Sequence, residues 1–276
     1  MIRTLFLLST LAAPALAQDA PRVITLGGSV TEIAVALGAE DRLVARDTTS
    51  NFPESIRALP DVGYIRALSP ENILALDPTL IVAEGDAGPP EAVEVLKAAG
   101  IPFVLVPEAN DPNGVVAKIA AVADALDLPG DALAAEVQAG LDAASARAAE
   151  VPTPKRVLFI LSLQGGRVMA GGEGTEAEGI IRLAGGINAA TGFQGYKPMT
   201  DEAVLAAGPR GILMEGGEGA PSLSEAAVRA PPGPSPTPPA QAGAIVRMDG
   251  MLLLGFGPRT PDAAKALHDT LYGSVR

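Results

Sequence analysis

Tyr64 and Arg66, in the segment Gly63-Tyr64-Ile65-Arg66, are the residues whose types and spacing most directly suggest chemistry. A tyrosine phenolate is a hard anionic oxygen donor that suits ferric iron. A free phenol has a pKa of about 10 and is mostly protonated at neutral pH, so coordination needs the charge of the metal, a neighbouring cation, or both. Arg66, two residues on, can supply that charge. A packing tyrosine whose hydroxyl bonds to backbone fits the same residues, and both interpretations stay open.

A second tyrosine with a basic neighbour occurs at Tyr196-Lys197. Lys197 could pair with a carboxylate of a ligand, although a solvated surface lysine is an equal explanation. Met169, Phe256 and Arg259 could add apolar contact and a further cation to the same site. Core packing would explain Met169 and Phe256 just as well.

The two tyrosine segments belong to an internal duplication. Residues 63–71 and 195–202 follow one pattern, and further matches continue downstream at one constant offset: Ser69/Thr200, Glu71/Glu202, Leu74/Leu205, Ala75/Ala206, Pro78/Pro209, Glu84/Glu215, Gly85/Gly216 and Gly88/Gly219. Internal similarity at a fixed spacing predicts repeated architecture. Here the repeated unit is a whole lobe. Two similar lobes that face each other form a cleft, and each copy brings a tyrosine and a basic residue to it.

Glu71 and Glu202 occupy the same place in the two copies, each two residues after a Ser or Thr that can cap a helix. A glutamate in the first helical turn stabilises the helix dipole by about 0.3–1 kcal/mol. The two side chains could also serve as acidic knobs, one per lobe, that dock onto basic pockets of a symmetric partner. The two roles are compatible.

The hydrophobic pattern alternates between strands and helices, which predicts an α/β fold with mainly parallel, helix-covered sheets. We expect two similar Rossmann-like lobes. The expected strands are residues 22–26, 43–45, 80–83, 103–106, 155–161, 211–214 and 244–247, and the expected helices are residues 31–38, 70–76, 91–99, 175–184, 201–207 and 261–271. The proline-rich segment 231–239 is expected to be a surface loop.

Residues 131–150 contain no proline and place Leu133, Val137 and Leu141 at four-residue steps, which predicts one helix about 30 Å long. The predicted organisation is therefore an N-terminal lobe at 22–128, a linking helix at 129–152 and a C-terminal lobe at 153–276. A rigid helix between the lobes would allow only a small closure.

The first 17 residues have the features of a secretory signal peptide: Arg3, an apolar run from Leu5 to Leu11, and the small-residue site Ala15-Leu16-Ala17. We expect cleavage after Ala17. The run is shorter than the ~20 apolar residues of a membrane span. A lipoprotein would have a cysteine directly after the cleavage site, whereas this chain has Gln18 there. The expected location is therefore the periplasm.

Composition argues against several classes of function. The formal net charge of −12 disfavours a nucleic-acid partner, and the absence of cysteine removes thiolate nucleophiles and iron–sulfur sites. His268 is the single histidine and falls in a polar terminal helix, where we expect it to face solvent. The glycine-rich segment 171–174 fits no phosphate-binding motif and is expected to be a turn lining the cleft. The sequence therefore indicates a binding protein rather than an enzyme.

Three segments of the chain resemble motifs of the haem-binding periplasmic proteins of bacterial haem ABC importers: Val62-Gly63-Tyr64-Ile65-Arg66-Ala67-Leu68-Ser69, Gly195-Tyr196-Lys197-Pro198 and Met248-Asp249-Gly250-Met251-Leu252-Leu253-Leu254-Gly255-Phe256-Gly257-Pro258-Arg259. The resemblance covers essentially the whole mature chain. It implies the class III periplasmic-binding-protein fold, in which one long helix joins two α/β lobes, and a monomer that carries haem.

The resemblance also implies roles for individual residues. Tyr64 would be the axial ligand of ferric haem, and Arg66 would hydrogen-bond to its oxygen. Glu71 and Glu202 would meet the permease dimer, which gives the only contact with the inner membrane. Some relatives carry a second-lobe histidine near the strand that here reads Leu161-Ser162-Leu163-Gln164. Without one, a five-coordinate site is expected, with Tyr196, Lys197 and Arg259 as further contacts.

Two other functions remain open at this point. A carrier of a ferric siderophore or of cobalamin would use the same fold without needing Tyr64 as a metal ligand. An extracytoplasmic hydrolase or sensor domain would need a nucleophile–base pair or an output segment.

Overall fold

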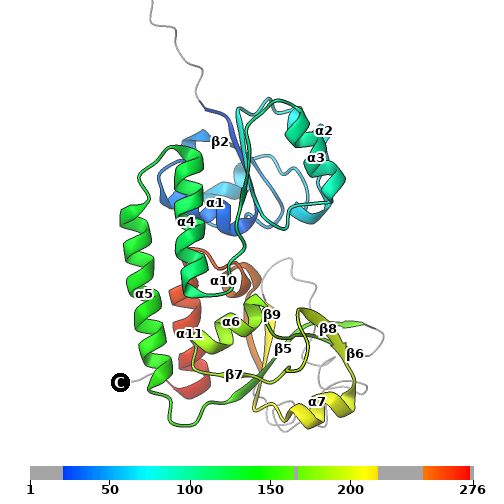
Figure 1. The fold of residues 1–276 in the computed structure, drawn as a ribbon, viewed down its shortest axis with the longest axis vertical. Helices are drawn as coiled ribbons and strands as arrows, with labels where there is room; N and C mark the ends of the chain where they lie inside the picture. Colours follow the sequence, from blue (N-terminus) through cyan, green and yellow to red (C-terminus); the bar gives the residue numbers. More distant parts are fainter. Residues whose placement is uncertain (1–20, 165–166, 217–244, 274–276) are drawn as a thin grey trace, which may run out of the picture.

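Two separate β-sheets, one in each half of the chain, organise the fold (Figure 1). The computed structural model describes residues 21–164, 167–216 and 245–273. The predicted signal peptide, the proline-rich segment 231–239 and Gly219 lie outside these residues. The sheets confirm the expected α/β fold with two lobes.

The first lobe contains a four-stranded parallel sheet with strand order β2-β1-β3-β4. Every residue of β1 is buried, as expected for a central parallel strand covered by helices on both faces. The strands are β1 (Val23–Leu26), β2 (Leu43–Arg46), β3 (Leu80–Glu84) and β4 (Phe103–Val106), and the helices are α1 (Gly28–Ala36), α2 (Pro70–Leu74), α3 (Pro90–Ala98) and α4 (Pro112–Leu126).

The second sheet has six strands in the order β10-β9-β5-β6-β8, with β7 also paired to β5. Pairs β5–β9, β9–β10 and β5–β7 are parallel, whereas β5–β6 and β6–β8 are antiparallel. The expectation of mainly parallel strands is confirmed, and the two antiparallel pairs lie on one side of this sheet. The strands are β5 (Arg156–Gln164), β6 (Arg167–Gly171), β7 (Ile187–Asn188), β8 (Tyr196–Met199), β9 (Gly211–Gly216) and β10 (Ile245–Asp249), and the helices are α6 (Glu176–Leu183), α7 (Asp201–Ala207), α10 (Gly250–Leu254) and α11 (Thr260–Tyr272).

The long helix α5 (Asp131–Ala149) runs beside both lobes (Figure 1) and packs against α4 and α11. Its buried positions Val137, Leu141 and Ala144 form the apolar stripe that faces these helices. The same hydrophobic core continues from Val30 of the first lobe to Phe159 of the second. Continuous packing of this kind resists separation of the lobes. Among the described residues no helix is long and apolar enough to cross a membrane.

His268 is buried, with 4% of its surface exposed, so the expectation that it faces solvent was wrong. It lies on the same face of α11 as Ala264 and Leu271, which are also buried. Its Nδ1 is 3.1 Å from the carbonyl oxygen of Ala184, and its ring centroid is 5.1 Å from that of Tyr272. The polar sequence of α11 did not predict that His268 is buried. Its hydrogen-bond partner, Ala184, lies at the end of α6 and 84 residues away in the sequence.

Candidate functional site

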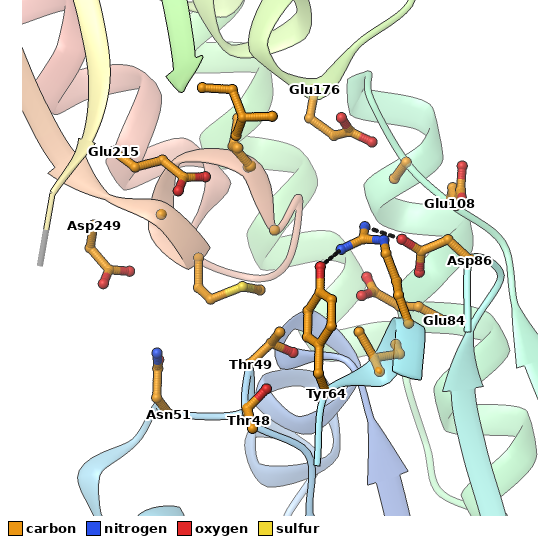
Figure 2. A pocket seen from close by; sticks show the side chains of 18 of the residues that line it. Thr48, Thr49, Asn51, Tyr64, Glu84, Asp86, Glu108, Glu176, Glu215 and Asp249 are labelled. Carbon is orange, nitrogen blue, oxygen red and sulfur yellow. Dashed lines mark hydrogen bonds and ion pairs between the residues drawn. The ribbon is translucent and has the colours of Figure 1, made fainter. Parts of the chain in front are cut away.

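A cavity of about 780 Å³ lies between the two lobes and takes its walls from both. This volume falls within the roughly 300–1,000 Å³ of small-molecule and cofactor sites. Figure 2 shows polar side chains from both lobes pointing into it. The labelled lining residues are Thr48, Thr49, Asn51, Tyr64, Glu84, Asp86 and Glu108 of the first lobe and Glu176, Glu215 and Asp249 of the second.

Tyr64 reaches into the cavity from the start of a short 3₁₀ helix, η3 (Ile65–Ala67), with 43% of its surface exposed. Arg66 donates a hydrogen bond from Nη1 to the Tyr64 hydroxyl oxygen at 2.6 Å, and its Nη2 forms an ion pair with Asp86 (Figure 2). Burial lowers the pKa of Arg66, but Tyr64 and Asp86 outweigh it and raise that pKa above its ordinary value. The structure thus brings the predicted Tyr64 and Arg66 together at the cavity wall.

A glycine turn aims Tyr64 at the cavity. Gly63 has φ +100°, a conformation that a residue with a Cβ rarely adopts. Its amide donates to Asp61 Oδ1 at 2.8 Å, and its carbonyl accepts from the amide of Thr48 at 3.0 Å. These bonds fix the direction in which the chain enters η3.

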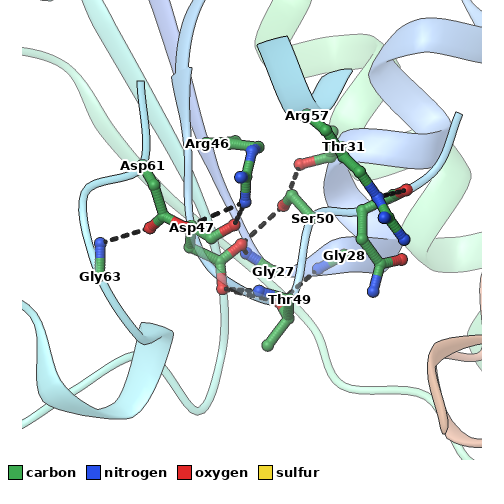
Figure 3. Close-up of polar contacts among 11 residues, drawn as sticks. Gly27, Gly28, Thr31, Arg46, Asp47, Thr49, Ser50, Arg57, Asp61 and Gly63 are labelled. Carbon is green, nitrogen blue, oxygen red and sulfur yellow. Dashed lines mark hydrogen bonds and ion pairs between the residues drawn. The ribbon is translucent and has the colours of Figure 1, made fainter. Parts of the chain in front are cut away.

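Buried Asp47 holds the neighbouring wall of the cavity, the loop that carries Thr48, Thr49 and Asn51. Figure 3 shows its contacts with Thr49 and Gly27. Its Oδ2 accepts from the amide and the hydroxyl of Thr49 at 3.0 and 2.7 Å. Its Oδ1 accepts from the Gly27 amide at 3.0 Å. The loop is therefore tied to the turn after β1. These residues were not predicted, although an aspartate directly after a strand is a usable signal for the carboxyl edge of a parallel sheet.

Lys118 is a second unpredicted member of the site and is only 2% exposed. Its Nζ donates to Glu84 Oε1 at 2.8 Å, to Ser29 Oγ at 3.0 Å and to the Gly255 carbonyl at 3.1 Å. Because Gly255 belongs to the second lobe, this one side chain connects the lobes beneath the cavity. A signal existed in the sequence: Lys118 stands on the apolar face of its helix, where a lysine requires partners.

Carboxylates dominate the cavity wall within the described residues, with six against the two cations Arg66 and Lys118. They are Glu84, Asp86, Glu108, Glu176, Glu215 and Asp249. Burial, and then the charge of Asp86, raises the pKa of Glu108. Burial and then Asp249 raise the pKa of Glu215 in the same way. Both shifts favour the neutral form of the carboxyl group.

Tyr196, the predicted counterpart of Tyr64, also lines the cavity. Its hydroxyl donates to Glu176 Oε2 at 3.0 Å, and its ring packs edge-on against Phe159 with centroids 6.3 Å apart. Burial, and then the negative charge of Glu176, raise the pKa of Tyr196 well above its ordinary value. Tyr196 is therefore a neutral hydrogen-bond donor, unlike Tyr64, which accepts from a cation.

The other predicted contacts are not among the lining residues of the cavity. Lys197 is exposed and Met169 is half-buried on paired strands. Phe256 is 1% exposed in the core and has φ +46°. Arg259 forms an ion pair with Glu32 of the first lobe.

The glycine-rich turn at 171–174 is likewise absent from the lining residues, although its Gly174 carbonyl accepts a hydrogen bond from Asn110 of the first lobe at 2.8 Å. Glu173 Oε1 accepts instead from the Gly192 amide at 2.8 Å, and the Glu173 amide donates to the Phe193 carbonyl at 2.9 Å. The turn is used to hold the 192–195 segment ahead of β8.

Glu71 and Glu202 lie exposed in the first turns of α2 and α7. The predicted helix caps are confirmed: Ser69 Oγ accepts from the Asn72 amide at 3.4 Å, and Thr200 Oγ1 accepts from the Ala203 amide at 3.3 Å. Hydrogen bonds from its own amide and from the Thr200 hydroxyl lower the pKa of Glu202. The duplicated sequence thus gives each lobe an equivalent exposed carboxylate.

Solved structures closely similar to this fold are periplasmic heme-binding proteins. BhuT in complex with two hemes is 43% identical, with a TM-score of 0.84 over 91% of this chain and 97% of that one. RhuT from Roseiflexus sp. RS-1 is 35% identical, with a TM-score of 0.87 over 92% and 98% of the two chains. A periplasmic heme binding protein from Pseudomonas aeruginosa is 32% identical, with a TM-score of 0.83 over 92% and 94%.

Curated relatives match over a shorter stretch. The vitamin B12-binding protein of Yersinia pestis (strain Pestoides F) is 43% identical over 97 residues, which is 35% of this chain and 34% of that protein. The match therefore spans about a third of the length of this curated relative. Over a much longer range, residues 23–251, the chain matches the sequence profile of the periplasmic binding proteins. The chain belongs to the periplasmic binding protein family.

Proposed function

We propose that this protein captures ferric haem in the cleft between its lobes and delivers it to an ABC permease in the inner membrane. The observation that carries the proposal is the exposed Tyr64 hydroxyl in the cavity, with the Arg66 guanidinium 2.6 Å away. The similarity to solved heme-binding proteins along more than nine-tenths of the chain supports the same ligand. A carrier of this kind acts by binding and release, without catalysis.

Tyr64 would supply one axial oxygen to the ferric ion, whose equatorial positions are filled by the porphyrin nitrogens. Arg66 Nη1 would donate a hydrogen bond to that oxygen, and its positive charge would balance part of the negative charge that a tyrosine oxygen carries as an iron ligand.

Tyr196 would contact haem without binding its iron. Its hydroxyl proton is engaged by Glu176, and the high pKa keeps the phenol neutral. Iron ligation by Tyr64 alone, in a five-coordinate site, follows from this difference. The carboxylates Glu176 and Glu215 would repel the two haem propionates, so we expect the propionate edge to face away from them.

Delivery would use the exposed Glu71 and Glu202, one on each lobe. A permease built as a dimer offers two equivalent basic surfaces, and paired carboxylates on the carrier match that symmetry. We propose that the protein works as a periplasmic monomer after removal of its first 17 residues.

A second candidate ligand is cobalamin, which the partial match to vitamin B12-binding proteins favours. Cobalamin carries its own corrin and lower ligand and does not need Tyr64. Calorimetric titration of the mature protein with haemin, cyanocobalamin and a ferric siderophore tests the proposal. Saturable one-to-one binding of haemin only is expected. Tight binding of cyanocobalamin with no uptake of haemin would replace haem by the corrinoid.

A further inference from the structure

Asp86 contacts the terminal nitrogen of Arg66 that does not face Tyr64. The guanidinium is held at both ends, with Nη1 on the Tyr64 hydroxyl and Nη2 on the Asp86 carboxylate (Figure 2). The two terminal nitrogens of arginine are fixed in one plane, so anchoring one of them sets the direction of the other. The Asp86 side chain is 24% exposed and that of Arg66 is 56% exposed, so the anchor is the more enclosed partner.

The turn that carries Asp86 is fixed to the helix that carries Arg66. The Gly88 amide donates to the Ile65 carbonyl at 2.9 Å, and the Leu68 amide donates to the Gly88 carbonyl at 2.8 Å. These backbone bonds hold the position of the carboxylate relative to η3. The backbone near Asp86 is therefore held in place independently of the ion pair with Arg66.

Other carboxylates in the cavity could compete with Asp86 for Arg66. Glu84 and Glu108 line the same wall, and the charge of Arg66 already lowers the pKa of Glu108 against the opposing effects of burial and neighbouring carboxylates. An arginine side chain that is more than half exposed has many rotamers available. A competing ion pair with Glu108 would withdraw Nη1 from Tyr64, so the orientation of Arg66 needs a dedicated partner.

We propose that Asp86 is a positioning residue that holds Arg66 on the Tyr64 oxygen and thereby slows the release of haem. This inference rests on the proposed function, since it assigns a role in retaining haem. Asp86 is ion-paired with Arg66 and would act on the Tyr64 oxygen through that residue.

The test is a double-mutant cycle on the rate of haem transfer to excess apomyoglobin, with the tyrosinate-to-iron charge-transfer band as a second readout. Asp86→Ala is expected to speed release about tenfold, the effect of losing one charge-assisted hydrogen bond. Asp86→Asn keeps an oxygen acceptor in the same place and is expected to restore most of the wild-type rate. In the Arg66→Ala background, Asp86→Ala should change neither the rate nor the band.

Asp269→Asn is the matched control, because Asp269 pairs with Lys265 on the exposed face of α11. It should release haem at the wild-type rate. Release from Asp86→Ala at the wild-type rate, or an equal acceleration in the Arg66→Ala background, would overturn the inference while leaving haem binding intact. Failure of the wild type to take up haemin would overturn the proposed function and this inference with it.

Discussion

Glu84 and Glu215 occupy equivalent positions in the two halves of the sequence and face the same cavity from opposite lobes. Glu84 ends β3 and Glu215 lies near the end of β9, so the duplicated sequence places both carboxylates at the carboxyl edges of parallel strands. Their partners differ. Glu84 is paired with buried Lys118, whereas burial and Asp249 raise the pKa of Glu215.

This difference predicts opposite effects of two matched substitutions. The folded protein binds a proton at Glu215 more tightly than the unfolded chain does. The contribution of this group to stability is therefore complete below the ordinary pKa of 4.5 and falls as the pH rises through the folded pKa. Glu215→Gln should raise the melting temperature at pH ~7, with little difference below pH ~4.5. Glu84→Gln should lower it at pH ~7. Melting curves that shift in the same direction for both variants would contradict this account.

Lys118 should be the most costly polar side chain of the site to remove. Lys118→Met leaves the Glu84 carboxylate without its cation and removes a donor from the Gly255 carbonyl, and breaking such a buried pair costs about 3 kcal/mol or more of unfolding free energy. Urea denaturation measures the loss. Lys265→Met, which breaks an exposed pair on α11, should cost much less unfolding free energy. Equal losses of unfolding free energy in the two variants would show that the buried contacts of Lys118 stabilise the fold no more than an exposed ion pair does.

Tyr196 should be dispensable for iron ligation. Tyr196→Phe removes only the hydroxyl that donates to Glu176, so the absorption spectrum of the haem complex should keep its tyrosinate-to-iron band. A modest change in affinity, within about tenfold, is expected from loss of one hydrogen bond. Disappearance of the band in this variant would assign the ligand to the second lobe.

Glu71 and Glu202 should matter for transport and not for haem binding. Both carboxylates are exposed, and neither lines the cavity. The double variant Glu71→Ala/Glu202→Ala should bind haemin with unchanged affinity and fail to stimulate the ATPase activity of its reconstituted permease. The matched control is Glu91→Ala/Glu136→Ala, which removes two exposed carboxylates elsewhere. Full stimulation by the first double variant would remove both residues from the docking surface.

Local sequence signals predicted the parts of the fold whose formation depends on residues close together in the sequence. The apolar run of β1, the stripe of α5 and the capping residues Ser69 and Thr200 all appear where expected. Periodicity and capping act over a few residues and can be seen in the chain itself. β6 and β8 were not among the expected strands, so their antiparallel pairing was not predicted either.

In the candidate site, too, the contact between sequence neighbours was predicted and the long-range contacts were not. Tyr64 and Arg66 are two residues apart, and their contact could be anticipated from spacing. Asp86 and Lys118 reach the site through tertiary contacts, with Lys118 bonded to a carbonyl 137 residues away. Arg259 was expected near the ligand, but it pairs with Glu32 across 227 residues of sequence. Long-range ion pairs of this kind are set by the packing of the lobes, which a single sequence does not reveal.

The most direct test of the central claim is a titration of haemin into the mature protein, followed by absorption spectroscopy, in parallel with Tyr64→Phe. The substitution removes the oxygen that accepts from Arg66 and leaves the ring in place. We expect saturable one-to-one binding by the wild type, with the spectrum of high-spin, tyrosinate-ligated ferric haem, and loss of that spectrum in the variant. Absence of saturable binding by the wild type, or identical spectra from both proteins, would contradict Tyr64 as the ligand of haem iron.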